Sequence, residues 1–363
     1  MSRYYETHAA SAPGWELDDL ATDENTQVHP IPMERMPAPV KDWASLLKLG
    51  ALIKRLHPQI VHTHTPKAGL LGMIAAYLCR VPVRLHTVAG IPWMESRGSK
   101  RKILQFMEKL TYRFANHVYS NSHALREFIL ACNLLPAYKI SVIAQGSSNG
   151  INTSWYSQTE EVMKQAQALK DKWDLKDEKV ILFVGRLVKD KGIEELLAAY
   201  QNLREQHKLK LLLVGPFEEE RDPLSAWATK LIEDDDDIAT PGFVKDVRPY
   251  MALSYVLAFP SYREGFPNVP MQAGAMGLPS VVTDINGCNE IVKEGENGLL
   301  VPPKDADALA EALDKVLSNK VLYNELALNA RPMITSRFEQ NLVWEALLEE
   351  YRGHLQNVGL NVQ

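Results

Sequence analysis

The stretch KVILFVGRLVKDKGIEELLAAY, residues 179–200, joins a continuous apolar run to a helical pattern through a turn that begins and ends with glycine. A continuous apolar run is typical of a strand that is buried on both faces of a parallel sheet. In open parallel sheets, ligands bind beyond the carboxyl ends of the strands. The stretch therefore predicts an α/β fold with a binding site at its turn.

The same alternation of apolar runs and helical patterns covers most of the chain. In the first half we expect strands at 59–64, 83–88, 117–120 and 140–144, and helices near 43–57, 67–79, 99–115 and 122–132. In the second half we expect strands at 179–184, 208–214, 256–259, 279–283 and 298–301. The polar stretch 146–159 is the expected linker. The pattern predicts two doubly wound, Rossmann-like domains, residues 1–155 and 156–337, and a last segment, 338–363, whose helix near 338–355 has no strand after it.

The composition indicates a folded cytoplasmic protein. Its 363 residues suffice for two domains, and 46% of them are apolar while 23% are charged, which argues against disorder. We find no uncharged apolar stretch long enough to span a membrane, and no secretion signal at the start. Cys79, Cys132 and Cys288 are too few and too far apart for a disulfide framework or a zinc cluster.

Positive charge is concentrated in the first 150 residues, which hold 17 Lys and Arg against 11 Asp and Glu. Much of it falls on one amphipathic segment, at Arg97, Lys100, Arg101, Lys102, Lys109 and Arg113. Two interpretations stay open: a helix that lies on anionic lipid at the inner face of the cell membrane, or a solvated basic face. Nucleic acid is not an expected partner, because the pI is about 6.1 and no stripe of alternating basic and aromatic residues occurs.

Two turns carry the candidate chemistry. In the first, Gly185 ends a strand and Arg186 and Lys191 follow, placed to hold a phosphate or pyrophosphate. The second is the segment SYREGFPNVP, residues 261–270, in which Glu264 can accept hydrogen bonds from sugar hydroxyls. The alternatives without a ligand are a surface loop with incidental charges for the first turn and a helix-capping carboxylate for Glu264.

In order and spacing, VGRLVKDKG, LKLLLVG, PGFVKDV, FPSYREGFPNVPMQAGAMGLPSVVTDINGCNEIV and ENGLLVPPKD resemble the retaining glycosyltransferases of family 4, whose fold is called GT-B. In the first half, IVHTHTPKAGLLGMIAA, VPVRLHTVAGIPW and GSSNGIN are similar to the branch of CapM-type capsular and lipid-linked polysaccharide glycosyltransferases. The resemblance covers most of the chain.

The resemblance implies two Rossmann-like domains that face a cleft, with the acceptor bound by the first, a nucleotide-sugar by the second, and a last helix that crosses back to the first. It implies catalytic roles for His86, Arg186, Lys191 and Glu264. The implied donor-binding residues are Gly185, Arg186, Lys191, Phe243, Val244, Glu264, Gly265, Phe266, Pro267, Asn268, Val269 and Gln272. His64 and Lys67 are the candidates for an acceptor phosphate. For His86 the alternative is a core histidine, and for His62 with His64 a zinc site is not expected, because no third ligand is evident.

The sequence departs from the family pattern in two respects, at one residue and at the start of the chain. The family has a second glutamate where this chain has Gln272, and since an amide also bonds ribose hydroxyls we expect altered affinity rather than lost chemistry. Family members also open with a strand, a glycine-bearing loop and a helix, about 25 to 30 residues that we do not recognise here. The loss of a central strand exposes unpaired backbone edges.

The leading hypothesis is a retaining hexosyltransferase of the EC 2.4 class that takes a nucleotide diphosphate sugar, with UDP as the expected nucleotide, to a lipid-linked or growing saccharide in capsule or cell-surface polysaccharide biosynthesis. No cofactor and no metal are expected. The alternative is a nucleotide-sugar binding or assembly protein of the same fold with impaired catalysis. Nucleotide-sugar epimerisation is weaker, because the segment 261–270 matches transferases better.

Overall fold

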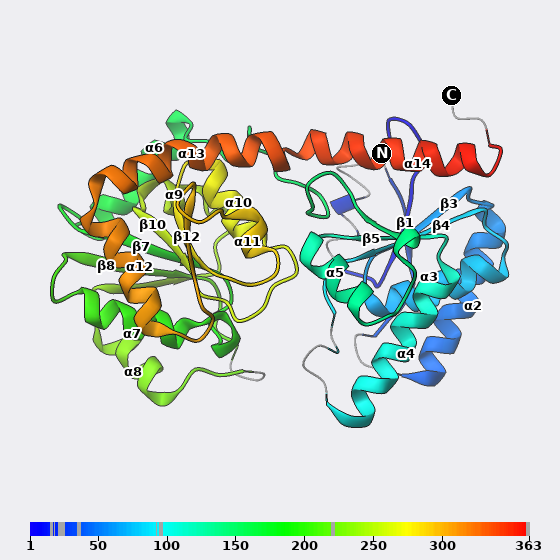
Figure 1. Cartoon of the computed structure of the whole chain (residues 1–363), viewed down its shortest axis with the longest axis horizontal. Helices are drawn as coiled ribbons and strands as arrows, with labels where there is room; N and C mark the ends of the chain where they lie inside the picture. Colours follow the sequence, from blue (N-terminus) through cyan, green and yellow to red (C-terminus); the bar gives the residue numbers. More distant parts are fainter. Residues whose placement is uncertain are drawn as a thin grey trace. The chain divides into compact units, whose positions relative to one another are not determined.

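We analysed a computed structural model of the chain, which describes residues 1–14, 17, 19–20, 26–34, 38–91, 93, 97–218 and 222–360. Internal contacts divide the chain into two compact units (Figure 1). Unit 1 comprises Met1–Ser148 together with Val343–Gln363, and unit 2 comprises Asn149–Leu342. The divisions therefore fall a few residues before the expected boundary at 155/156 and a few residues after the one at 337/338.

Unit 2 is built on one six-stranded sheet in the order β12-β11-β10-β7-β8-β9, with every neighbouring pair parallel. The strands are β7 (Lys179–Val184), β8 (Leu209–Val214), β9 (Ile238–Gly242), β10 (Val256–Phe259), β11 (Ser280–Thr283) and β12 (Gly298–Val301). The first strand, β7, lies between β8 and β10, so the strand order reverses there. Such a reversal is where doubly wound sheets open a crevice for ligands.

Helices connect the strands of unit 2 and cover its sheet. They are α6 (Glu160–Lys172), α7 (Ile193–Leu203), α8 (Ala226–Asp234), α9 (Arg248–Leu253), α10 (Asn268–Ala275), α11 (Cys288–Ile291), α12 (Ala306–Ser318) and α13 (Lys320–Phe338), with a 3-10 turn, η2, at Lys189–Lys191. Buried apolar side chains from these helices and from both faces of the strands form one large core. Strands buried on both faces by such a core read as continuous apolar runs in the sequence, as residues 180–184 and 211–214 do.

Unit 1 carries two smaller parallel sheets. Strands β1 (His8–Ser11) and β2 (Gln27–Pro30) pair with each other, and β3 (Ile60–Thr63), β4 (Val83–Val88), β5 (His117–Ser120) and β6 (Ile140–Val142) form a second sheet in that order. Its helices are α2 (Pro39–Leu56), α3 (Pro66–Leu78), α4 (Gly98–Phe114) and α5 (His123–Ala131), with a 3-10 turn, η1, at Ala137–Lys139. The helix expected at 43–57 begins earlier, because Pro39 occupies a first-turn position where its missing N–H costs nothing.

The last helix, α14 (Gln340–Asn357), follows α13 after a single residue, and from Val343 onward it belongs to unit 1. Its Tyr351 hydroxyl lies 2.6 Å from Nδ1 of His62 on β3. The Tyr119 hydroxyl on β5 donates to Glu350 at 2.8 Å and lies 2.9 Å from Nε2 of His354. The helix without a strand partner thus packs on the second sheet of unit 1.

The predicted fold class is confirmed, since both units are built on parallel sheets joined by helices. Strands β1, β2 and β9 were not predicted, because each has only four or five residues and polar or proline positions interrupt it. Among the described residues, no helix is both long and apolar enough to cross a membrane.

Candidate active site

The carboxyl ends of β7 and β10, neighbours in the sheet of unit 2, bring the two predicted turns together. Lys191 ends the 3-10 turn after β7, and Glu264 lies in the loop after β10. Nζ of Lys191 donates to Oε1 of Glu264 at 2.5 Å, and the two side chains are only 16% and 15% exposed. Because both side chains are largely shielded from water, the positions of the two charged groups are fixed more firmly than in a surface ion pair.

Ser261 forms a further hydrogen bond to the carboxylate of this pair. Its hydroxyl donates to Oε1 of Glu264 at 2.8 Å, and the residue is fully buried. Because Oε1 accepts from both Ser261 and Lys191, the carboxylate is held in one orientation. Nothing in the segment 261–270 indicated this role for Ser261, since a small polar residue carries no signal of burial.

Backbone contacts fasten the two turns to each other. The N–H of Tyr262 donates to the carbonyl of Asp190 at 2.9 Å, and Arg263 forms an ion pair with Asp190 at 2.9 Å. Gly192 begins α7 with φ of 71°, and a Cβ there would collide with the carbonyl oxygen of Pro260. Only glycine permits both the left-handed backbone and the close approach of the two loops.

Arg186, the other predicted phosphate ligand, is paired with a carboxylate in the loop after β8. Its Nη1 lies 2.6 Å from Oε2 of Glu218, with side chains 42% and 35% exposed. A bridge between Leu187 and Phe217 keeps the loops after β7 and β8 together. Glu218 was missed, because nothing in the sequence relates two residues 32 positions apart. The Arg186 guanidinium therefore lies at the carboxyl end of the sheet. A bound anion would compete with the Glu218 carboxylate for it.

The loop from Gly265 to Pro267 leads into α10, whose first turn has no side-chain cap. The amides of Asn268 and Val269 are thus open to an anion. The side-chain amide of Asn286 donates to the Gly265 carbonyl at 2.7 Å and positions this loop. The next residue, Gly287, has φ of 77°, and a Cβ on it would strike the same carbonyl oxygen.

Three further donor candidates, Gln272, Phe243 and Val244, belong to other elements of unit 2. Nε2 of Gln272 donates to the Tyr156 hydroxyl at 2.8 Å, so the amide that replaces the family's second glutamate is anchored within unit 2. Phe243 and Val244 follow the carboxyl end of β9, and Phe243 is 74% exposed. An exposed aromatic ring at a strand end is available to stack on a planar base.

His86, the predicted catalytic residue of unit 1, is almost fully buried at 2% exposure. Its Nδ1 lies 2.8 Å from the Thr63 hydroxyl, and the ring fills the space beside Gly69, where a Cβ would come within 2.5 Å. Burial, with a smaller effect of His64, lowers the pKa of His86 to about 3. The imidazole is therefore neutral at physiological pH, and its packing also suits the alternative of a core histidine.

The acceptor candidates follow the end of β3. The ring of His64 stacks on His62 with centroids 4.5 Å apart, and burial lowers the pKa of both histidines. Nζ of Lys67 lies 2.7 Å from Asp42 of α2, with side chains 17% and 21% exposed. These residues lie in unit 1 and the donor candidates in unit 2, so each group is a separate constellation.

No group of three or more His, Cys, Asp or Glu is placed to hold a metal ion anywhere in the described ranges. Cys288 lies at the start of α11 near Glu264 and Lys191, but it is fully buried. Burial raises the pKa of its thiol well above the usual value, so it remains a packed, protonated side chain.

Both halves of the chain match known families. Residues 5–146 match the family described as Glycosyl transferase 4-like domain, and residues 165–333 match Glycosyl transferases group 1. Among solved structures, HepE of Anabaena in complex with UDP aligns with a TM-score of 0.81, covering 95% of this chain and 92% of HepE, at 20% identity. A glycosyltransferase from Rickettsia africae aligns at 0.79 over 96% of this chain and 90% of its own, at 22% identity. These structural likenesses confirm the GT-B fold.

Curated relatives extend the match over nearly the whole chain. The UDP-Gal:alpha-D-GlcNAc-diphosphoundecaprenol alpha-1,3-galactosyltransferase of Escherichia coli is 30% identical over 311 residues, which are 82% of this chain and 76% of that protein. The capsular polysaccharide biosynthesis glycosyltransferase CapM of Staphylococcus aureus is 33% identical over 354 residues, which are 97% of this chain and 90% of CapM. The chain therefore belongs to the group 1 glycosyl transferases, homologous to capsular and lipid-linked polysaccharide glycosyltransferases, as its motifs predicted.

Proposed function

We propose that the protein transfers a hexose from a UDP-sugar to a lipid-linked or growing saccharide, with retention of configuration, in capsule or cell-surface polysaccharide biosynthesis. The observation that carries the proposal is the Lys191–Glu264 pair at the carboxyl ends of β7 and β10, with Arg186 at the start of the same turn after β7. The pair offers a cation to a diphosphate and a fixed carboxylate to a sugar hydroxyl. Relatives named for UDP-galactose and for a diphosphoundecaprenol acceptor support the choice of substrates.

In the proposed reaction, the bond between the anomeric carbon and the diphosphate oxygen breaks. The acceptor oxygen forms its bond on the same face of the sugar and gives its proton to the leaving diphosphate. Arg186, Lys191 and the amides of Asn268 and Val269 stabilise the negative charge that develops on the diphosphate. Because these groups compensate the negative charge of the leaving diphosphate, we propose that transfer needs no bound metal.

Residues of unit 1 take the acceptor side in this proposal. Lys67 and His64 would meet the acceptor phosphate, and Lys67 would exchange its partner Asp42 for that anion. His86 would act near the transferring sugar as a neutral hydrogen-bonding group. Since its pKa is about 3, its protonation contributes no change in activity between pH 5 and 8.

Calorimetric binding of UDP and a panel of UDP-sugars, together with turnover of the same donors with and without a polyprenyl-diphosphate saccharide, tests the function. We expect binding of at least one donor and turnover that requires the acceptor. Binding without turnover would favour the alternative of a nucleotide-sugar binding protein. Conversion of the donor sugar without acceptor would point to epimerisation, and no binding would reject a UDP donor.

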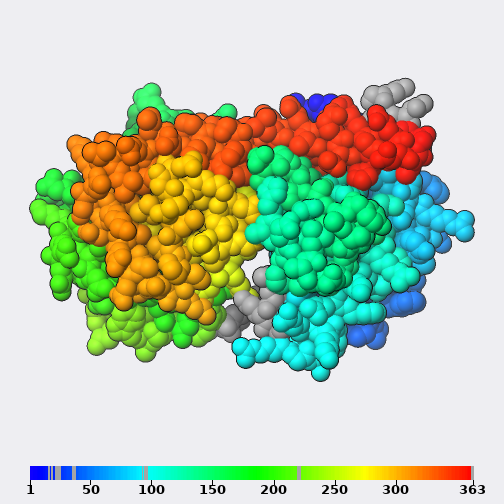
Figure 2. All heavy atoms as spheres, in the orientation of Figure 1, coloured from blue at the N-terminus to red at the C-terminus, as the bar shows by residue number. Residues whose placement is uncertain are grey.

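We also propose that α4 brings the protein to the inner face of the membrane. Lys100, Arg101 and Lys102 are exposed in its first turns, and Ile103 and Phe106 expose 59% and 66% of their surface beside them. Figure 2 shows the beginning of this helix, in cyan, on the visible surface. Exposed apolar side chains flanked by lysine and arginine are typical of helices that lie on anionic lipid.

Replacement of Lys100, Arg101 and Lys102 by glutamine should weaken binding to phosphatidylglycerol vesicles about 100-fold, since each basic residue near such a surface contributes about 1 kcal/mol. Flotation with phosphatidylglycerol vesicles over a salt series measures the effect, and uncharged phosphatidylcholine vesicles are the reference. The triple replacement Lys164→Gln, Lys170→Gln and Lys172→Gln, on α6 of unit 2, is the matched control. Binding that ignores salt would contradict the electrostatic role.

A further inference from the structure

Gln272 and Tyr156 form a contact between α10 and the first segment of unit 2. Nε2 of Gln272 donates to the Tyr156 hydroxyl at 2.8 Å. The other end of the amide, Oε1, receives no hydrogen bond from any described residue, and it is not one of the buried polar atoms that lack a partner. Oε1 is therefore an acceptor open to a ligand, on the same helix as the open amides of Asn268 and Val269.

Tyr156 is held in place by its backbone as well as by its ring. Its carbonyl accepts from Nη1 of Arg331, on α13, at 2.8 Å. The same guanidinium donates to the carbonyls of Thr153 and Ala275, so α13 fastens this segment to the end of α10. The Tyr156 ring packs against the core of unit 2. The hydroxyl therefore stands at a defined point beside Gln272.

An amide and a carboxylate differ in symmetry at this position. The two oxygens of a glutamate are equivalent acceptors, so either can meet a hydroxyl whichever way the group turns. A glutamine has one acceptor end and one donor end, so the amide presents its acceptor to a ligand only when it is oriented. Burial, with a smaller effect of Asp246, raises the pKa of Tyr156. Its hydroxyl is therefore uncharged at physiological pH, and it accepts from Nε2.

We propose that Tyr156 is a positioning residue that orients the Gln272 amide, so that Oε1 accepts a hydrogen bond from the ribose of the donor nucleotide. The inference rests on the proposed transfer from a UDP-sugar, and it explains how a chain with glutamine at this position keeps a defined acceptor. Without the hydroxyl the amide is free to turn, and Nε2 competes for the place of Oε1. Since a neutral hydrogen bond contributes roughly a factor of five to an equilibrium, loss of the orientation should weaken the binding of UDP about fivefold.

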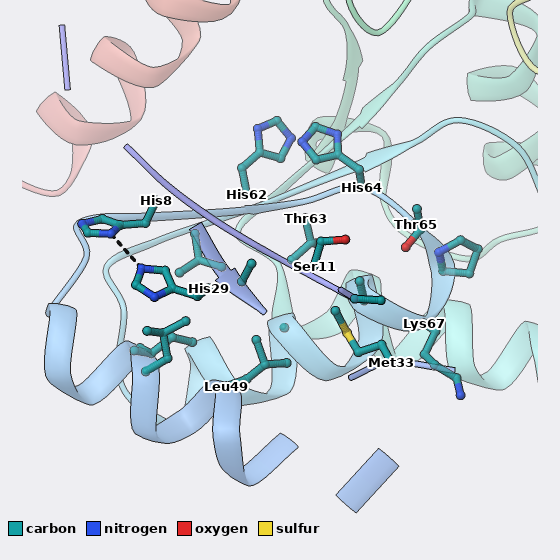
Figure 3. Close-up of a pocket in the computed structure, with 18 of the residues that line it drawn as sticks. His8, Ser11, His29, Met33, Leu49, His62, Thr63, His64, Thr65 and Lys67 are labelled. Atoms are coloured by element: carbon teal, nitrogen blue, oxygen red, sulfur yellow. Dashed lines mark hydrogen bonds between the residues drawn. The ribbon is translucent and has the colours of Figure 1, made fainter. Parts of the chain in front are cut away.

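Calorimetric titration of the full chain with UDP and with dideoxy-UDP, which lacks both ribose hydroxyls, tests the inference. We expect Tyr156→Phe to weaken the binding of UDP about fivefold and to leave the binding of dideoxy-UDP unchanged. Equal weakening of both nucleotides would show a merely structural role and overturn the proposal. The matched control is Tyr351→Phe, which removes a hydroxyl that lies 2.6 Å from Nδ1 of His62, in the pocket of unit 1 that Figure 3 shows. It should leave both affinities unchanged.

Gln272→Glu provides the sharpest comparison, because a carboxylate needs no orientation. In the Gln272→Glu background, Tyr156→Phe should change the affinity for UDP by no more than about twofold, and in the Gln272→Ala background it should have no effect. The same fivefold loss with glutamate as with glutamine would overturn the orienting role. If the unaltered chain binds neither nucleotide, the proposed UDP donor fails together with this inference, whereas binding of UDP that does not depend on Tyr156 overturns the inference alone.

Discussion

Replacement of both Arg186 and Lys191 by alanine should lower acceptor-dependent sugar transfer by about 10⁴-fold, since each removed donor to a developing charge typically costs 10² to 10³. The two side chains stand at opposite ends of the one turn that follows β7, and no other cation is paired with Glu264 among the described contacts. Loss of Lys191 also leaves Glu264 without its counter-charge, so the carboxylate that should orient the sugar loses its fixed position. Initial rates at saturating UDP-sugar measure the effect.

The matched control is Lys164→Ala with Lys176→Ala, which removes two cations from exposed positions of the same unit. Thermal unfolding of each variant separates a catalytic loss from a loss of folding. A second variant, Lys191→Met, keeps the length and apolar stem of the side chain. Near-normal turnover in the folded double alanine variant would contradict the assigned phosphate roles.

Acidification should destabilise unit 1 well before its carboxylates are protonated. Burial lowers the pKa of His62, His64 and His86 in the folded chain, to about 3 for His86. In the unfolded chain each histidine has its ordinary pKa of about 6.5. Below that pH these histidines bind protons in the unfolded chain but stay unprotonated in the folded chain. The free energy of unfolding therefore falls as the pH falls from about 7 toward 3. His86 alone should contribute a loss of about 2 kcal/mol at pH 5.

Urea unfolding between pH 5 and 8 measures this loss. In His86→Gln, which cannot be protonated, the fall in stability between pH 7 and 5 should be about 2 kcal/mol smaller than in the original chain. His57→Asn, at an exposed position, is the matched control. A free energy of unfolding that is flat across this range would show that the buried histidines accept protons in the folded state.

The sequence predicted the parts of the fold that a periodic pattern controls. Strands such as β7, with a run of buried apolar residues, and helices with a clear apolar face were located within a few residues. The short strands β1 and β2 were missed, because their residues are half-buried and polar and their pairing depends on contacts far along the chain. Tertiary packing decides such strands more than local propensity does.

The candidate site was predictable where chemistry follows a strand. Arg186, Lys191 and Glu264 all come directly after apolar runs, so their place at one edge of the sheet followed from topology. Their partners could not be found in this way, because Glu218 meets Arg186 across 32 positions and Ser261 is buried as a small polar residue in a segment noted for Glu264. For His86 both interpretations still stand, because a buried, neutral imidazole packed beside Thr63 and Gly69 fits a core histidine as well as a hydrogen-bonding group near the sugar.

The division of unit 1 between the two ends of the chain imposes an order on its synthesis. Residues 1–148 leave the ribosome first, but their packing partner, Val343–Gln363, is made last. At roughly 5 to 20 residues per second, the intervening unit takes about 10 to 40 s to emerge. During that interval the hydroxyl of Tyr119 and the ring of His62 lack their hydrogen-bond partners on α14, whereas by its end all the strands of Asn149–Leu342 have been synthesised. The unit that begins the chain is therefore the last to be completed, and a nascent chain that stalls near its end holds a finished second unit beside an unfinished first one.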